Sequence, residues 1–308
     1  MRKRYGNMMQ FTLAHLSDVH LAPLPPVSPW QLMSKRITGY INWQRHRRGT
    51  MGTQTLDTLL KALAEKAPDH IAVTGDLTNL ALPAEFDQTR TWLSALGEAE
   101  EVSVIPGNHD AYVRDALESG LKQWAPWLTD DNGNATLSNT DFPYVRVREG
   151  VQIIGCSSAV ATPPFIAAGH FGEAQGAQLA HHLKAGRENG LFRVVLIHHP
   201  PVRGATIARK RLYGIGRFQT VIEEQGAELV LHGHTHLPQR HFIEGPDKHV
   251  PVYGVPAASE ATGRKRPPGA FNLFKIERAT HNTFKCSHEE WSVSSTDDIL
   301  LTDENQLY

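Results

Sequence analysis

Short apolar segments with the composition of buried β-strands recur up to residue 233. Between several of them, leucines at helical spacing, as at Leu56, Leu59 and Leu63, predict amphipathic helices. The expected strands lie at 11–16, 70–75, 102–107, 151–156, 193–198 and 228–233, and the expected helices lie at 55–67, 83–96 and 173–189. Because strand and helix alternate and the strands are continuously apolar, the pattern predicts an α/β fold with buried strands.

Beyond residue 250 the pattern changes, since apolar segments follow one another without a helix between them. Residues 249–255, 270–277 and 283–293 predict a cluster of antiparallel strands. The final stretch, 295–308, is acidic, and we expect it to fray or to dock only lightly. The chain shows no internal repeat and no low-complexity linker, so we expect a single domain over 1–308.

Two segments fit no core element, and both follow a predicted strand. Residues 22–50 begin as a proline-rich loop and continue as a basic helix or helix pair that carries Trp30, Tyr40 and Trp43. Residues 202–217 are basic and rich in glycine. Because the functional edge of an α/β protein lies at the carboxyl ends of its strands, we expect both insertions to cap the site.

The composition is that of an ordinary globular protein. Of 308 residues, 40% are hydrophobic and 20% are charged, which excludes a collagen, a coiled coil and general disorder. No apolar run approaches the roughly 18 residues of a membrane span. The basic N-terminus lacks the apolar segment of a secretory signal, and two cysteines cannot form a disulfide framework. We therefore expect a cytoplasmic protein.

The net charge of −1 conceals a segregation of charge along the chain. No acid occurs between Asp18 and Asp57 or between Glu188 and Glu223, and a third acid-free stretch follows Glu260. Each of these stretches carries several arginines and lysines, so each creates a local positive potential that attracts anions. The alternative is that these cations lie on solvent-exposed loops and bind no particular anion.

Polar residues that can bind a metal follow five of the predicted strands. They are Asp18, His20, Asp76, Asn108, His109, Asp110, His198, His199, His234 and His236. Residues two apart in extended backbone point to the same side, so Asp18 with His20, and His234 with His236, can aim two ligands at one place. Glycines at 75, 107 and 233 allow tight turns and a close backbone approach.

The chemistry of these residues predicts a pair of divalent metals. Imidazole, carboxylate and amide donors without thiolates suit Mn, Fe or Zn rather than a closed cysteine zinc site. There are more candidate ligands than one tetrahedral site uses. Two metals about 3.5–4 Å apart are the arrangement that catalyses in-line displacement at phosphorus.

The motifs Asp-x-His, Gly-Asp, Gly-Asn-His-Asp, His-His and Gly-His-Thr-His span 18–236, and in this order they resemble those of the calcineurin-like metallophosphoesterases. The resemblance implies two facing mixed β-sheets flanked by helices, a four-layer αββα sandwich. It also implies the metal ligands. Asp18, His20 and His236 would bind one metal, Asn108, His198 and His234 would bind the other, and Asp76 would bridge the two.

The resemblance further implies roles for the residues around the metals. His109 matches a histidine that contacts the phosphate and protonates the leaving oxygen, and Asp110 would orient it. The ligand of the His-His pair precedes the proline by two residues, which selects His198. His199 would then support the ligands or face the substrate.

We therefore predict hydrolysis of phosphodiester bonds by attack of a metal-bridging hydroxide. Alternatives on the same centre are a phosphomonoesterase, a nuclease and a lipid or nucleotide pyrophosphatase. A non-catalytic scaffold is an alternative of another class, which the complete set of motif residues disfavours.

We expect a small phosphodiester or a nucleotide as the substrate. The candidate substrate contacts on the basic insertions are Arg45, Arg47, Arg209 and Arg211. The same insertions could instead meet a nucleic acid or a membrane surface, or could pack on each other as a purely structural cap.

Overall fold

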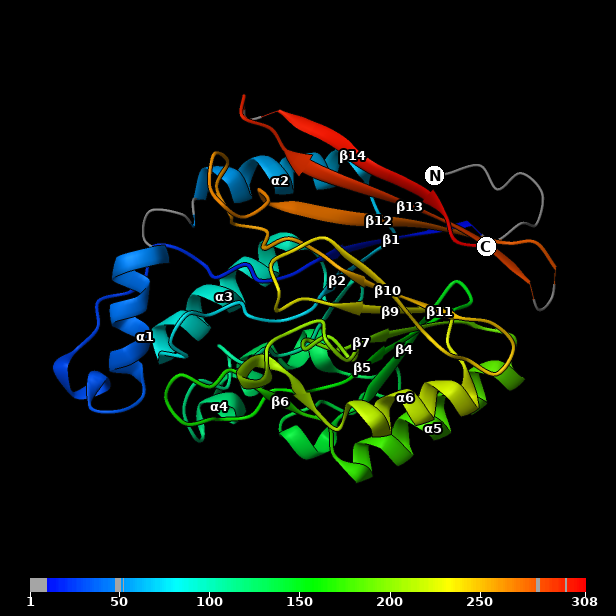
Figure 1. Ribbon diagram of the computed structural model, residues 1–308, viewed down its shortest axis with the longest axis horizontal. Coiled ribbons are helices and arrows are strands. Elements are labelled where there is room, and N and C mark those ends of the chain that lie inside the picture. Colours follow the sequence, from blue (N-terminus) through cyan, green and yellow to red (C-terminus); the bar gives the residue numbers. More distant parts are fainter. Residues whose placement is uncertain (1–9, 48–50, 52, 281–282, 297) are drawn as a thin grey trace.

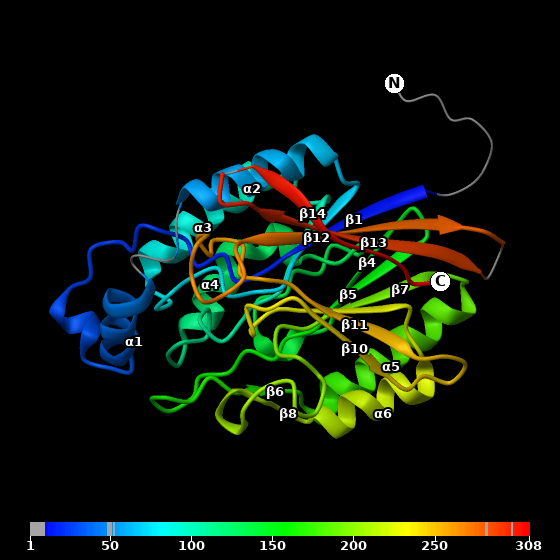
Figure 2. The same ribbon diagram turned by 45° about the horizontal axis from the view of Figure 1, so that its top comes forward.

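The structure is a computed structural model that describes residues 10–47, 51, 53–280, 283–296 and 298–308. Two six-stranded mixed sheets face each other, and helices cover their outer faces (Figure 1 and Figure 2). The first sheet contains β1 (Gln10–Leu16), β2 (His70–Val73), β3 (Val102–Val104), β12 (Ala270–Arg278), β13 (Phe284–Val293) and β14 (Ile299–Gln306). The second contains β4 (Tyr144–Arg148), β5 (Val151–Gly155), β7 (Phe192–Leu196), β9 (Leu229–His232), β10 (Gln239–Ile243) and β11 (Val250–Gly254).

The order of the strands is β14-β13-β12-β1-β2-β3 in the first sheet and β10-β11-β9-β7-β5-β4 in the second. A short ribbon pairs β6 (Gly169–His170) with β8 (Leu212–Tyr213). The helices are α1 (Arg36–Asn42), α2 (Thr53–Lys66), α3 (Pro83–Leu96), α4 (Ala116–Trp124), α5 (Glu173–Glu188) and α6 (Ile215–Gln225). Shorter turns are η1 (Pro29–Leu32), η2 (Trp43–Arg47), η3 (Ala125–Leu128), η4 (Asn139–Asp141) and η5 (Ala208–Lys210). This layered arrangement confirms the fold that the motifs implied.

Alternate residues of the central strands face two different apolar cores. Ile153 of β5 and Val194 of β7 belong to the larger core, which also contains Leu13 of β1 from the other sheet. Their neighbours Ile154 and Val195 belong to a second core, between the sheet and the helices α5 and α6. Because both faces of these strands are buried, their sequences are continuously apolar rather than alternating.

The antiparallel cluster expected after residue 250 forms only in part. Strands β12 and β13 pair antiparallel with each other over nine residue pairs. Strand β11, however, lies inside the second sheet, where it pairs parallel with β9 and antiparallel with β10. All five residues of β11 are buried, so its apolar run is that of an interior strand.

The acidic end of the chain is an ordered strand, and the expectation that it frays is wrong. Strand β14 pairs with β13 along most of its length and forms the edge of the first sheet. Beyond the strand, the Tyr308 hydroxyl donates to the Glu228 carbonyl oxygen at 2.6 Å. The carboxylates Asp303 and Glu304 in its second half suit this edge position, because charged side chains on an edge strand prevent pairing with other chains.

The described part of the insertion at 22–50 folds as η1, α1 and η2, so of the expected helix or helix pair it forms one short helix with irregular turns at both ends. Its side against the core is fixed by Gly39, where a Cβ atom would strike the hydroxyl of Tyr112 and a methyl of Leu80. Residues 48–50 lie outside the described residues. Among the described helices, none has the length and apolarity that crossing a bilayer requires.

A buried histidine in β2 predicts how stability depends on pH. Burial and the nearby Arg146 and Arg148 lower the pKa of His70 from 6.5 to about 3. In the unfolded chain His70 is protonated below about pH 6.5, whereas in the folded chain it stays neutral. The free energy of unfolding therefore falls as the pH drops from 6.5 toward 3. Between pH 7 and pH 5, His70 should cost the wild type about 2 kcal/mol of unfolding free energy, and the His70→Gln variant should not show this loss. Urea denaturation at both pH values checks this, and equal losses in both proteins would contradict it.

Candidate metal centre

The loops that follow β1, β2, β3, β7 and β9 meet where the two sheets come together. The Asp18 backbone N–H donates to the Gly75 carbonyl at 3.0 Å, and the Gly233 N–H donates to the His198 carbonyl at 3.1 Å. Gly233 also lies directly against Ser17 of the other sheet. The fold thus brings the motif residues of both sheets into one place.

Glycine is required at the three turn positions that the sequence singled out. Gly75 has a φ of +94°, which is strained for any residue with a side chain. A Cβ atom at Gly107 would strike the Asp76 carboxylate, and one at Gly233 would strike the Ser17 hydroxyl. Each glycine therefore lets backbone approach the candidate ligands closely.

Five of the seven expected metal ligands hold a strained backbone conformation. The φ angles are +52° at Asp18, +41° at His20, +56° at Asp76, +68° at His234 and +57° at His236. A left-handed conformation is uncommon for residues other than glycine. Such strain persists only where the surrounding structure imposes it, and it concentrates at functional sites.

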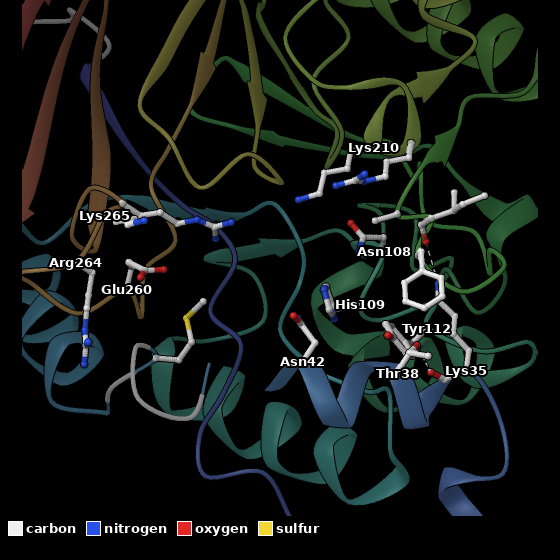
Figure 3. Close-up of a pocket in the computed structure, with 16 residues that line it drawn as sticks. Lys35, Thr38, Asn42, Asn108, His109, Tyr112, Lys210, Glu260, Arg264 and Lys265 are labelled. Atoms are coloured by element: carbon white, nitrogen blue, oxygen red, sulfur yellow. Dashed lines mark hydrogen bonds between the residues drawn. The ribbon is translucent and has the colours of Figure 1, made fainter. Parts of the chain in front are cut away.

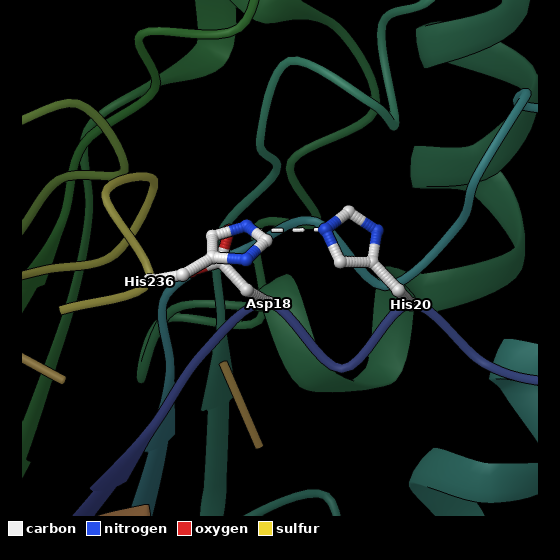
Figure 4. A group of neighbouring side chains, drawn as sticks. All are labelled: Asp18, His20 and His236. Carbon is white, nitrogen blue, oxygen red and sulfur yellow. Dashed lines mark ion pairs between the residues drawn. The ribbon is translucent and has the colours of Figure 1, made fainter. Parts of the chain in front are cut away.

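The first group of side chains contains Asp18, His20 and His236 (Figure 4). The Asp18 Oδ1 atom lies 3.1 Å from His236 Nε2 and 3.9 Å from His20 Nε2. This oxygen is buried and, among the described side chains, has only the two imidazoles beside it, whereas Oδ2 accepts the His234 backbone N–H at 2.9 Å. An ionised oxygen buried in this way calls for a cation.

The second group contains Asp76, His198 and His234, whose ligand atoms lie within 4.8 Å of one another. The Asp76 Oδ2 atom lies 3.4 Å from His198 Nε2 and 3.8 Å from His20 Nε2 of the first group. The Asn108 Oδ1 atom lies 3.3 Å from His198 Nε2. Asp76 is thus within reach of a histidine on each side.

Backbone carbonyls orient the imidazole rings. His20 Nδ1 donates to the Thr78 carbonyl at 3.0 Å, and His198 Nδ1 donates to the Thr74 carbonyl at 2.6 Å. His234 instead uses Nε2, which donates to the Lys210 carbonyl at 3.0 Å. In each ring the other nitrogen is then left as a lone-pair donor, which is how the outer partners of metal-binding histidines fix the tautomer.

The charges of the site also suit cations. Burial alone would raise the pKa of Asp18 and Asp76, but the neighbouring histidines hold the pKa of both carboxyls below its usual range. Burial lowers the pKa of His234, so its imidazole is neutral. Burial alone would lower the pKa of His198, but the nearby Asp76 carboxylate outweighs burial and raises this pKa to about 9. A cation that binds here displaces a proton from the ligands.

The donor set therefore fits two divalent cations. The two groups share no residue, each combines carboxylate with imidazole, and Asp76 of the second group lies 3.8 Å from His20 of the first. Neither buried cysteine, Cys156 or Cys286, takes part in a group. Hard and intermediate divalent ions accept this combination of nitrogen and oxygen donors.

Residues 11–238 match the profile of the calcineurin-like phosphoesterases. The chain belongs to this family. Its members are metal-dependent hydrolases of phosphoric esters, so the motifs identified the family correctly. The metal identities that we expected, Mn, Fe or Zn, stay a prediction.

Two curated relatives of this phosphoesterase are named as phosphodiesterases. A Synechococcus protein named "Probable cyclic nucleotide phosphodiesterase" is 24% identical over 278 residues, which cover 88% of this chain and 90% of that protein. The glycerophosphodiester phosphodiesterase GpdQ of Enterobacter lignolyticus is 28% identical over 130 residues, or 42% of this chain and 40% of GpdQ.

Solved structures share the fold at low identity. A dimetal phosphatase from Danio rerio is 13% identical with a TM-score of 0.57, and the match covers 94% of this chain and 98% of that one. A purple acid phosphatase from yellow lupin is 11% identical with a TM-score of 0.58, covering 96% of this chain and 53% of that one. These likenesses confirm the layered fold.

His109 lies beside the phosphoesterase's first metal group, but Asp110 does not orient it. The His109 Nδ1 atom donates to the Asn79 carbonyl at 2.6 Å, and its ring stacks on Tyr112 with centroids 5.4 Å apart. Asp110 accepts its hydrogen bonds from the backbone N–H groups of Asp76, Leu77, Thr78 and Gly107 and from the Thr78 hydroxyl. Asp110 therefore shapes the turn that carries Asp76, because a carboxylate satisfies several converging backbone donors at once.

The geometry alone leaves the role of His109 open, because it also forms a group with His20 and Asp76. Its backbone N–H donates to the second carboxylate oxygen of Asp76 at 2.7 Å. His109 is therefore placed either to protonate a leaving group or to bind a metal.

His199 does not face the substrate. It is fully buried, its Nε2 donates to the Ala167 carbonyl at 3.2 Å, and its Nδ1 lies 2.8 Å from the Ser158 hydroxyl. Its ring packs on His234 with centroids 4.3 Å apart. Both ring nitrogens are thus engaged, and His199 supports His234 rather than binding substrate.

A cavity of about 910 Å³ lies beside the metal centre, with Asn108 and His109 in its wall (Figure 3). Figure 3 shows His109 between Lys35 on one side and Lys265 on the other. The cations that line the cavity are Lys35, Arg209, Lys210, Arg264, Lys265 and Arg266. Among the described lining residues Glu260 is the only acid, so the cavity attracts anions.

Among the arginines expected to contact substrate whose side chains the structure describes, Arg209 alone lines this cavity. The Arg211 guanidinium lies over the Tyr213 ring, 4.6 Å from its centroid. Arg45 is exposed and is not among the lining residues. The side chain of Arg47 lies outside the described part of the chain.

The sequence analysis missed two contacts that reach the centre. The Arg266 Nη1 atom lies 2.6 Å from His236 Nδ1, and Tyr112 stacks on His109. The acid-free stretch after Glu260 was a signal for Arg266. Nothing in the sequence distinguishes Tyr112 from other core aromatic residues.

Proposed function

We propose that this phosphoesterase is a phosphodiesterase that uses two divalent metals. The observation that carries the proposal is the pair of groups that meet at Asp76, one formed by Asp18, His20 and His236 and the other by Asp76, His198 and His234. These six residues, together with Asn108, would hold the metals. When bound, two such cations neutralise charge on the phosphoryl oxygens and lower the pKa of coordinated water.

The residues of the chain supply orientation and a proton. The Asn79 carbonyl accepts the hydrogen bond of the His109 Nδ1–H, so Nε2 is the atom that can carry a proton to a leaving oxygen. The stacked ring of Tyr112 restrains the imidazole in that orientation. The lysines and arginines of the cavity wall bind and orient the anionic substrate.

Two observations support a diester over a monoester. The curated relatives at 24% and 28% identity are both named as phosphodiesterases. The cavity of about 910 Å³ is also much larger than a phosphate group and extends to both sides of His109, so it can take a substituent on each side of phosphorus.

A substrate panel tests the proposal on protein with a measured metal content. We expect about two metals per chain, and with Mn²⁺ we expect bis(p-nitrophenyl) phosphate to be hydrolysed at least about tenfold more efficiently than p-nitrophenyl phosphate. Cyclic nucleotides, an oligonucleotide and a nucleotide pyrophosphate complete the panel. A preference for the monoester or the pyrophosphate would replace the proposal with that alternative, and a single metal per chain would overturn the dinuclear centre.

A matched pair of arginines tests the role of the cavity wall. Arg209 lines the cavity and Arg211 does not, although both side chains are exposed and lie two residues apart. Arg209→Ala should raise KM for a charged diester about fivefold, and its salt dependence should flatten because exposed charges are screened as ionic strength rises. Arg211→Ala should leave both unchanged. Equal effects of the two variants would show that net charge, rather than the cavity wall, attracts the substrate.

A further inference from the structure

Exposed apolar side chains lie on three segments that also supply residues of the cavity wall. Trp30 and Met33, around η1, are 80% and 74% exposed, and Phe165, between β5 and β6, is 81% exposed. Ile207, just before η5, is about half exposed. Monomeric proteins seldom leave large apolar side chains of several segments together in water, and such a patch marks a contact surface.

The faces of α1 show how this surface relates to the cavity. Thr38 and Asn42, four residues apart, line the cavity, and Gly39 packs against Tyr112. Ile37 and Ile41 are 48% and 43% exposed, and on a helix they lie beside the 38 and 42 positions. The outward face of α1 is therefore an apolar rim directly next to the face that forms the cavity wall.

Hydrogen bonds hold the three segments to one another. Lys35 Nζ donates to the Ile166 carbonyl at 3.1 Å and to the Thr162 hydroxyl at 2.8 Å. The Ala167 N–H donates to the Arg209 carbonyl at 3.0 Å. Figure 2 shows α1 and the green loop before β6 projecting on the same side of the molecule. We call the exposed apolar side chains on these segments the rim: Trp30, Met33, Ile37, Ile41, Phe165, Ile166 and Ile207.

The segments that carry the rim contain several cations and no acid. The chain carries no Asp or Glu at 19–56, 150–172 or 189–222, which are the stretches that supply the rim. Lys35, Arg209 and Lys210 lie in the same stretches and line the mouth. Protruding apolar side chains among cations complement a surface that is apolar inside and negatively charged outside, as an anionic bilayer is.

We propose that the rim docks on an anionic lipid bilayer, with the mouth of the cavity facing the headgroups. A folded protein partner fits less well, because it would close the mouth of the site that the substrate must enter. Apolar side chains that protrude from separate segments around an opening can enter a fluid surface without a matching shape. The docking does not depend on the diester activity proposed above.

Vesicle sedimentation with the full-length, metal-loaded protein tests this. We expect binding to vesicles of 70% phosphatidylcholine and 30% phosphatidylglycerol, little binding to pure phosphatidylcholine, and weaker binding at 0.5 M than at 0.1 M salt. The double variant Trp30→Ser with Ile37→Ser should lower the partition coefficient about tenfold or more. Neither residue lines the cavity, so hydrolysis of soluble bis(p-nitrophenyl) phosphate should change less than about twofold.

The matched control is Phe242→Ser with Leu300→Ser, which removes one aromatic and one aliphatic side chain, each about half exposed, from β10 and β14. It should bind vesicles like the wild type. Equal losses in both double variants, or equal binding to neutral and anionic vesicles, would overturn the proposal. So would a concentration-dependent dimer in light scattering that Trp30→Ser with Ile37→Ser abolishes, because the rim would then be a contact between copies. If the wild-type protein binds anionic vesicles but does not hydrolyse diesters, the proposed activity is refuted and the proposed docking is still supported.

Discussion

Asp76→Asn should lower kcat/KM for a phosphodiester by about 10³-fold. Asp76 lies between the two groups, with one oxygen 3.4 Å from His198 Nε2 and 3.8 Å from His20 Nε2. Removing its negative charge weakens the attraction for both cations and leaves their mutual repulsion less compensated. Each metal contributes several kcal/mol to the transition state, and 1.36 kcal/mol corresponds to a tenfold change in rate.

Asparagine is the informative replacement because it keeps an oxygen for the His109 backbone N–H, which donates to Asp76 Oδ1 at 2.7 Å. The turn should therefore keep its shape while the charge is lost. Steady-state kinetics and metal analysis of the same preparation give the result, with Asp87→Asn on the exposed side of α3 as the control for loss of one carboxylate. Near-normal turnover with two metals per chain would show that Asp76 does not bridge them.

The sequence was sufficient to predict which side chains come together in the two groups, because their positions follow local rules. Each candidate ligand lies within four residues of the end of a buried strand, and the glycines beside them mark where backbone must come close. The strand ends of a layered α/β fold lie together, so the order of the motifs along the chain was enough to place His20 near His236. A hydrogen bond from the His234 backbone N–H to Asp18 joins the two loops, although these residues are 216 positions apart in the sequence.

The supporting contacts could not be predicted, because many of them involve backbone atoms. The Asn79 carbonyl holds His109, and Asp110 holds backbone N–H groups of the turn at Asp76. A carbonyl or an amide is present at nearly every residue, so no side-chain pattern reveals these bonds. The role expected for Asp110 was wrong for this reason.

The ends of the second sheet and of the chain were also beyond the pattern. A buried apolar run such as β11 fits either sheet, and only tertiary pairing with β9 decides between them. Strand β14 lies at the edge of the first sheet, and an exposed edge strand that carries Asp303 and Glu304 cannot be told from a frayed acidic tail by composition. Charge segregation, by contrast, correctly indicated a basic cavity mouth, although most of the lining cations differ from those singled out.

His109→Ala should lower turnover about 10²–10⁴-fold on a diester that expels an alkoxide, such as glycerophosphocholine. An alkoxide needs a proton as it leaves, and His109 Nε2 is the atom placed to supply it once Nδ1 is held by the Asn79 carbonyl. The loss should be much smaller on bis(p-nitrophenyl) phosphate, because p-nitrophenolate leaves without a proton. His181→Ala, which removes an exposed histidine from α5, should affect neither substrate.

Comparison of the two substrates, with metal analysis, separates the two roles that the geometry allows. If His109 binds a metal together with His20 and Asp76, the variant loses metal and slows on both substrates alike. If His109 is the acid, both metals stay and the loss depends on the leaving group. The second outcome is expected, because Asp18, His20 and His236 form a group without it. Equal losses with both metals retained would leave His109 the task of binding phosphate and assign proton transfer to water.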